Sequence, residues 1–277
     1  MIMSRPKFER SASVHGLQRH GGKILHIIAI TVLCLMWVPM LTLIILSMSA
    51  DGLLAFPPES LTLDWYRDIL TSDQALSAIE NTLKIGVVAT PLSMIVATAA
   101  VIGIERYEFR AKPWVLLLAI SKLLIPGIVG AVAIFQAAET VGVSGYWLVV
   151  FVHIIATLPF STLVMLETYS NFDKNLESAA MDLGANEITT FKSVTIPNMM
   201  TGIIATGLLT FTFSFNEFIF TYFVRDSGTV TLPVYLWNNI VYGLDPGVNA
   251  ISVIFLGVAT SSLLIAVALT SVRKVVM

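Results

Sequence analysis

Six long apolar segments, separated by more polar ones, dominate the chain. They span residues 24–48, 83–104, 114–138, 146–166, 199–224 and 248–271. Each is close to the roughly 20 residues that a helix needs to cross a bilayer. Strands of a membrane β-barrel would instead alternate polar with apolar residues over about 10 positions. The pattern therefore predicts an all-α membrane protein with six transmembrane helices, and a membrane domain over residues 24–277.

The composition agrees with this pattern. Of the 277 residues, 56% are hydrophobic and only 12% are charged, against about 25% charged in a soluble domain. That is too little charge to cover a water-facing surface of this size. The net charge of −2 gives no indication of nucleic-acid binding. The lone Cys34 and four scattered histidines lack the spacing of a metal site, so no metal is predicted.

The basic residues predict the orientation, since cytoplasmic connections carry an excess of Lys and Arg. With the N-terminus inside, twelve of the 16 basic residues fall on the inner side: Arg5, Lys7, Arg10, Arg19, Lys23, Arg106, Arg110, Lys112, Lys174, Lys192, Arg273 and Lys274. The outer side holds Arg67, Lys84 and Arg225. Both termini are therefore predicted to be cytoplasmic. Residues 1–23 form a basic tail, either mobile or an interfacial entry helix.

The outer loop 49–82 is predicted to contain a short helix. Trp65, Tyr66, Ile69 and Leu70 follow a Pro-Pro turn at helical spacing. Such a stripe suits a helix at the membrane interface. A lid on the bundle and a docking surface are both consistent with it.

The inner connection 167–198 is much longer than the usual 4–6 residues or so, and long connections are often functional. It reads as a helix, a turn and a second helix. Asp173 is placed to cap the first helix, and Leu176, Ala179, Ala180 and Leu183 lie on one face. Gly184 suits a helix end, and Pro197 suits the first turn of the next span. The small apolar face fits either docking on a cytoplasmic partner or packing on its own bundle.

This connection resembles the EAA motif of membrane subunits of ABC-type importers. The residues that carry the resemblance, and the predicted role in coupling to an ATPase, are Glu177, Ser178, Ala179, Ala180, Asp182, Leu183, Gly184 and Pro197. The spacing from Gly184 to Pro197 matches the motif. Ser178 stands where the family usually has a glutamate, and Glu177 is one position earlier.

The resemblance extends over about residues 24–275 to the spermidine/putrescine-type branch. It includes Asp64-Trp65-Tyr66, Asn81-Thr82-Leu83 and Thr231-Leu232-Pro233. It implies a permease subunit in a bacterial cytoplasmic (inner) membrane. The implied partners are a second permease subunit, two cytoplasmic ATPase subunits and an extracytoplasmic solute-binding protein. The chain contains no GxxxxGK(S/T) phosphate loop, so ATP and Mg²⁺ are expected on the ATPase, with no cofactor and no catalysis on this chain.

Four polar residues inside the predicted spans are candidates for the translocation pathway: Asn216, Glu217, Lys122 and His153. Glu217, roughly 10 Å from the outer end of a continuous fifth helix, either contacts an ammonium-bearing solute or makes a contact between subunits. For Lys122 three roles are open: its side chain snorkels to the cytoplasm, it pairs with an acid, or it repels a cationic solute. A lysine at this position favours a zwitterionic or anionic solute. His153 is either a packing residue or part of the pathway. Pro126-Gly127 beside Lys122 predicts a kink or close packing.

These features predict the permease subunit of an importer for a small polar solute: polyamine-like, amino-acid- or opine-like, or another charged amine. The alternative is a self-contained secondary transporter or channel. Such proteins usually show inverted repeats or a filter sequence, and neither is visible. An intramembrane enzyme would need a larger set of reactive side chains than His153 and Glu217 provide.

The topology can be tested with reporter fusions. Fusions after residues 110 and 190 are expected to report the cytoplasm, and fusions after 60 and 235 the outer side, because of the distribution of basic residues. A reporter at 190 that is active on the outer side would contradict the orientation, since the long connection would then lie away from ATP.

Overall fold

The computed structural model describes residues 12–50, 56–242 and 247–276. Within these ranges the regular elements are helices joined by short connections, and one isolated bridge pairs Ser49 with Leu61. The helices are α1 (Ala12–Leu46), α2 (Asp64–Thr71), α3 (Asp73–Arg106), α4 (Lys112–Ile120), α5 (Gly127–Val141), α6 (Tyr146–Ser170), α7 (Asn175–Asp182), α8 (Glu187–Thr190), α9 (Ile196–Phe215), α10 (Ile219–Val224), α11 (Leu232–Tyr242) and α12 (Gly247–Val276). The predicted all-α fold is confirmed.

The described helices give a lower span count than the sequence pattern. Four are long and apolar enough to cross a membrane, or five if α4 and α5 together form one broken span. The last segment counts there only as a shorter apolar helix, over Gly247–Ser261. A total of six spans therefore stays a prediction.

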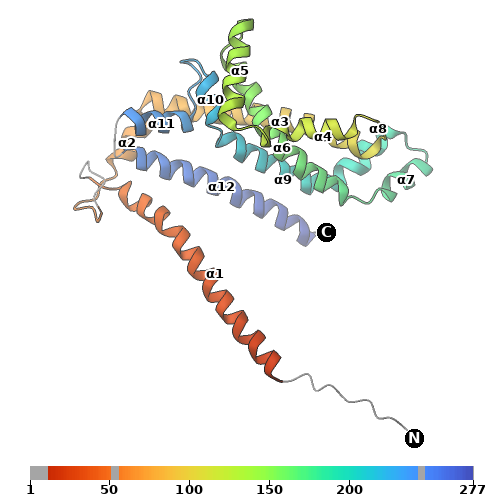
Figure 1. Cartoon of the computed structure of the whole chain (residues 1–277), viewed down its shortest axis with the longest axis horizontal. Coiled ribbons are helices and arrows are strands. Elements are labelled where there is room, and N and C mark those ends of the chain that lie inside the picture. Colours follow the sequence, from red (N-terminus) through yellow and green to blue (C-terminus); the bar gives the residue numbers. More distant parts are fainter. Residues whose placement is uncertain (1–11, 51–55, 243–246, 277) are drawn as a thin grey trace.

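Helices α3, α6 and α9 form the centre of the bundle and run side by side along its length (Figure 1). Small residues let them approach closely, and serine and threonine hydroxyls connect them. Thr157 donates to Ser93 (3.0 Å), Ser93 bonds to Ser161 (3.1 Å), and Ser161 bonds to Thr210 (2.8 Å). Each of these side chains is buried. The hydroxyls thus satisfy one another where water is absent.

Helix α1 diverges from this bundle and its far end stands apart from the other helices (Figure 1). It contacts α12, but its apolar segment Leu25–Leu46 is unburied in the isolated chain. Trp37, for example, is 57% exposed. A helix that is apolar all round belongs in a membrane or against another protein.

Two predicted spans are not single helices. The third is broken between α4 and α5 by a short 3₁₀ turn, Ser121–Leu123, and bends by 103°. Pro126 directly before α5 lacks the N–H that a continuing helix needs, so the predicted kink is confirmed. The fifth is broken at Asn216–Phe218 between α9 and α10. Glu217 was expected within a continuous helix, and that was wrong: it lies in the break.

The end of the bundle that lies away from α7 is closed by α2, α11 and the start of α12 (Figure 1). Ile69 of α2 is buried with Leu232 and Ile251, and Trp65 and Tyr66 pack against the same cluster. Trp65 also donates from Nε1 to the carbonyl of Ser49 (2.8 Å). The predicted helix therefore exists, and Trp65, Tyr66 and Ile69 pack it as a lid on the bundle, while Leu70 of the same stripe is 60% exposed.

Close packing of α9 on α6 depends on Gly202. A Cβ built there would lie 2.8 Å from Cβ of Thr168 and still closer to that side chain's outer atoms. Gly202→Ala is expected to lower the free energy of unfolding by about 2 kcal/mol through overpacking. The measurement is thermal unfolding of the purified protein.

Gly103→Ala provides the control, because a Cβ at Gly103 meets nothing within 4 Å. It should be neutral or slightly stabilising. Thr168→Ala should restore part of the stability of Gly202→Ala, because alanine removes the two nearest atoms of that side chain but keeps its Cβ at 2.8 Å. Equal melting temperatures for both glycine variants would contradict this packing.

Candidate functional site

The inner connection forms the predicted helix–turn–helix. Helix α7 ends at Asp182 with Leu183 as its C-cap, and the next residue, Gly184, has a φ of +93° in the left-handed region. The N–H of Gly184 donates to Met181 O (2.9 Å) and that of Ala185 to Ala180 O (3.1 Å), a common helix ending that satisfies the last carbonyls. The predicted stop at Gly184 is confirmed. Pro197 lies in the first turn of α9, also as predicted.

The start of α7 differs slightly from the prediction. Asp173 was expected to cap the helix, but the capping position is Lys174. Oδ1 of Asp173 accepts from the N–H (3.0 Å) and side-chain amide (2.9 Å) of Asn175. Asp173 therefore holds the turn that leads into α7.

A polar clamp fixes α7 to the bundle. Glu177 accepts hydrogen bonds from the Arg106 guanidinium at the end of α3 and from the Thr195 hydroxyl just before α9. Arg106 also donates from Nε to the hydroxyl of Tyr169 on α6 (2.9 Å). One carboxylate on α7 is thereby linked to the inner ends of three helices. We refer to Arg106, Tyr169, Glu177 and Thr195 as the inner clamp.

The inner clamp explains why the glutamate stands at position 177, one residue before its usual place in the motif. Ser178, which occupies the usual glutamate position of the motif, is exposed. Glu177 is partly buried and makes the contacts. A second ion pair joins Lys174 to Glu105 at 3.1 Å. Helix α7 is thus attached to α3 through two neighbouring acid–base pairs.

Much of the surface of α7 is open. No residue of α7 is buried, and the apolar side chains of Leu176, Met181 and Leu183 are 42%, 45% and 90% exposed. Ala179 and Asp182 are exposed as well. The chain itself therefore leaves most of the predicted small apolar face uncovered.

The break in the fifth segment is stabilised by Glu217. Its Oε1 accepts from the N–H of Phe220, and its Oε2 accepts from the N–H of Thr221, both at 3.2 Å. These are orphan donors at the start of α10, which have no partner within the helix. The carboxylate also suits the positive end of the helix dipole. Glu217 thus makes its contacts within the chain.

His153 connects the two sides of the same break. From α6, its Nδ1 bonds to Ser214 of α9 and its Nε2 to Thr221 of α10, both at 2.8 Å. The Thr221 hydroxyl donates to Oε2 of Glu217 (3.3 Å), so its oxygen accepts from Nε2–H of His153, and Nδ1 accepts from Ser214. The imidazole is 1% exposed. His153 is a satisfied packing residue in this chain, and it links α6, α9 and α10.

Lys122 lies in the other break. Its Nζ is 5.5 Å from the ring centroid of Phe220 on α10, and it interacts electrostatically with Glu217. Lys122, His153 and Glu217, far apart in the sequence, are thus brought together around α10. Asn216 does not join them: its side chain is exposed and donates to the carbonyl of Thr212 (2.8 Å).

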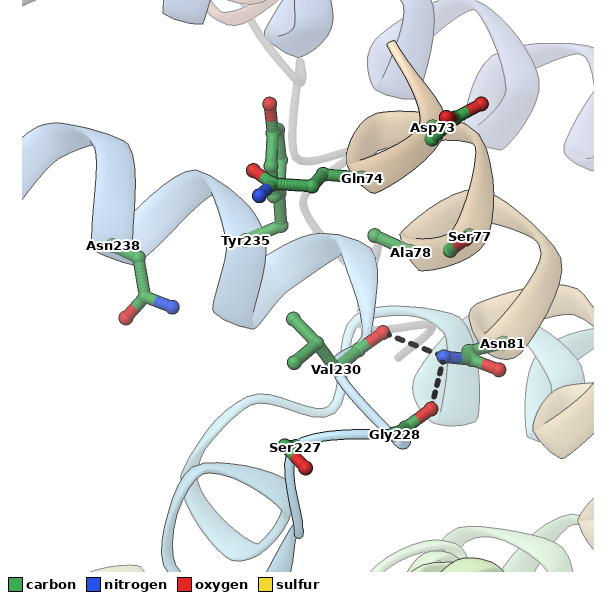
Figure 2. A pocket seen from close by; sticks show the side chains of 10 residues that line it. All are labelled: Asp73, Gln74, Ser77, Ala78, Asn81, Ser227, Gly228, Val230, Tyr235 and Asn238. Carbon is green, nitrogen blue, oxygen red and sulfur yellow. Dashed lines mark hydrogen bonds between the residues drawn. The ribbon is translucent and has the colours of Figure 1, made fainter.

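A second polar site lies at the outer end, a cavity of about 490 Å³ between α3, α11 and the connection that precedes α11. Figure 2 shows the Asn81 amide donating to the carbonyls of Gly228 (3.0 Å) and Val230 (3.1 Å), which ties α3 to that connection. Thr229 donates to Asp226 (2.7 Å), and this hydrogen bond lowers the pKa of the Asp226 carboxyl. The cavity has no signature in the sequence, because its lining residues come from two distant segments.

Comparisons with known proteins agree with the helical membrane fold described above. No protein-family model matches the chain. It is 27% identical over 222 residues to the spermidine/putrescine transport system permease protein PotC of Escherichia coli K12, which covers 80% of this chain and 84% of PotC. It is also 27% identical over 230 residues to the putrescine transport system permease protein PotI of the same strain, covering 80% of this chain and 82% of PotI.

Solved structures share the fold. A chain of a bacterial ABC transporter involved in the import of the acidic polysaccharide alginate superposes with a TM-score of 0.69 and 15% identity, covering 94% of this chain and 99% of that one. A chain of the MetNI methionine ABC transporter gives 0.57 and 13%, covering 75% and 95%. The chain is a permease subunit of an ATP-binding-cassette importer. The predicted resemblance is confirmed, and the permease carries its EAA-type connection on α7 and α8.

The role of His153 can be tested by stability. His153→Ala removes both hydrogen bonds and leaves buried hydroxyls of Ser214 and Thr221 without this partner, which costs about 1–3 kcal/mol for each group left unsatisfied. We expect a lower melting temperature of the purified permease. Gln, which offers one donor and one acceptor, should retain part of the stability.

Thr212→Ala serves as the control on α9, because the Thr212 hydroxyl donates to the Leu208 carbonyl of its own helix (2.8 Å). It should change the melting temperature little. A His153→Ala variant that melts like Thr212→Ala would show that the links across the break contribute nothing to stability.

Proposed function

We propose that this permease moves a small amine-bearing solute across a bacterial cytoplasmic membrane, driven by ATP hydrolysis on separate subunits. One observation carries the proposal: α7 is held by the inner clamp while its apolar face stays open. A short, fixed helix with exposed Leu176, Met181 and Leu183 suits insertion into a cleft of a cytoplasmic protein. The relatives PotC and PotI are named as permeases for spermidine and putrescine, which supports an amine.

The proposed assembly follows from the same features. It comprises a second permease, two ATPase subunits docked at the inner side and a solute-binding protein at the outer side. A related structure is described as an alginate transporter in complex with a solute-loaded periplasmic protein, which supports the outer partner. ATP and Mg²⁺ would be bound by the ATPase subunits. The basic residues support an orientation with both termini cytoplasmic, residues 1–23 as an inner tail and the permease domain over 24–277.

The inner clamp provides a route for transmission. A displacement of α7 would be passed by Glu177 to Arg106 of α3, and by Thr195 to α9. These helices lead to the break at Asn216–Phe218 and its polar residues. We therefore propose that Glu217, Lys122 and His153 lie along or beside the pathway, with Asn216 at its exposed edge.

Gly184→Asp tests the coupling role. Aspartate adds a charge beside the exposed Leu183 and a side chain at a φ that L residues rarely adopt. We expect ATPase co-purification and binding-protein-stimulated ATP hydrolysis to fall at least tenfold, while the amount of permease in the membrane is unchanged. Gly184→Asn, which tolerates positive φ without the charge, should lose less.

Ala111→Asp is the matched control. It adds the same carboxylate at another exposed inner position, where Ala111 precedes α4 and provides no side-chain cap, and aspartate suits such a position. Its ATPase activity should equal that of the unsubstituted complex. Full coupling in Gly184→Asp would refute docking through α7.

A further inference from the structure

Among the lysines whose side chains the structure describes, Lys122 and the exposed Lys192 form no salt bridge. Lys84, Lys112 and Lys174 each pair with a glutamate at 2.6–3.1 Å. Lys122, half-buried in the break of the third segment, has no carboxylate within 4.0 Å among the residues the structure describes. An ammonium within a membrane segment is costly and usually has a partner. Its partner is therefore to be sought outside the described chain.

The direction of Lys122 is informative. Its Nζ lies over the ring of Phe220, which is 2% exposed, and not along the outside of the bundle. The ammonium thus turns toward α10 and the break beside Glu217. It does not extend away from these residues, as a snorkelling lysine at a lipid-facing position would.

Glu217 does not supply the missing partner. Both of its oxygens accept N–H groups at the start of α10, and its interaction with Lys122 acts over more than ion-pair distance. The carboxylate is held by the helix end and forms no ion pair with the ammonium within 4.0 Å. Lys122 therefore remains able to bind a second anion.

Aromatic rings complete the surroundings of the break. Phe218 lies 5.4 Å from Tyr222 and 5.4 Å from Trp237, measured between ring centroids. Such faces attract an ammonium group, and Glu217 adds negative charge nearby. The break thus offers one region for a cation and, at Lys122, one for an anion.

We propose that Lys122 binds the carboxylate of the transported solute, so that the solute is an amino-acid-like zwitterion and not a bare polyamine. The inference rests on the proposed import function and specifies its substrate class. A polyamine carries ammonium groups alone, and Lys122 would repel them. A zwitterion instead places its carboxylate at Lys122 and its ammonium toward Glu217 and the rings.

The experiment uses the complete complex in proteoliposomes, with the permease pair, the ATPase and the binding protein. ATP-driven uptake is measured for two labelled probes of the same length, 4-aminobutyrate and putrescine, which differ in one terminal group. We expect at least tenfold faster uptake of 4-aminobutyrate. Lys122→Gln should lower that uptake at least tenfold, and Lys122→Arg, which keeps the charge, should restore most of it.

Lys84→Gln is the control, because Lys84 has an exposed side chain paired with Glu80 on the surface; its uptake should change less than twofold. Faster uptake of putrescine, uptake of neither probe, or uptake of 4-aminobutyrate unaffected by Lys122→Gln would each overturn the inference. If the Lys122→Gln complex fails to assemble, the inference is tested by the unsubstituted complex alone, through its relative uptake rates for 4-aminobutyrate and putrescine. Uptake that continues without ATP would instead refute the proposed import function itself.

Discussion

Every backbone N–H and C=O inside a bilayer must find a partner within the protein, because the hydrocarbon offers none. A continuous helix satisfies this requirement by itself, but the third and fifth segments of this permease are interrupted. Each interruption leaves backbone N–H groups without a helical carbonyl partner, so these groups need another acceptor. At the fifth segment Glu217 provides it, by accepting the N–H groups of Phe220 and Thr221. The polar centre of the permease is built around that contact.

The same contact explains why polar residues from distant parts of the chain meet there. Thr221 is fixed by Glu217 and in turn accepts from His153. His153 also accepts from Ser214 on the far side of the break. Helix α10 is consequently attached to α6 and α9 by hydrogen bonds, although the backbone between them is irregular. Buried polar networks of this kind specify one arrangement when all members are satisfied.

The inner end of the permease uses a related arrangement for a different purpose. The inner clamp ties α7 to three helix ends, while the apolar side chains of α7 remain exposed. In the proposed coupling role, a fixed base with an open face would transmit force better than a mobile loop, because a push on α7 would move the helices to which it is bonded. The shift of the glutamate from the usual motif position to Glu177 keeps this geometry, since Glu177 points to Arg106 and Ser178 points to solvent.

The sequence alone determined the features that depend on local order. Long apolar segments specify membrane helices, Gly184 and Pro197 specify where the inner helices end and begin, and the motif spacing specifies the family. It also marked Lys122, His153 and Glu217, because ionisable residues in apolar segments are conspicuous.

Their mutual contacts required the tertiary structure. Hydropathy averages over a window, so it does not register a three-residue break such as Asn216–Phe218, and pairing between side chains 60 or more positions apart has no local signal. Only the packing of α5, α6 and α10 decided that Glu217 caps a helix, that His153 bridges a break, and that Lys122 has no carboxylate within 4.0 Å among the residues that the structure describes.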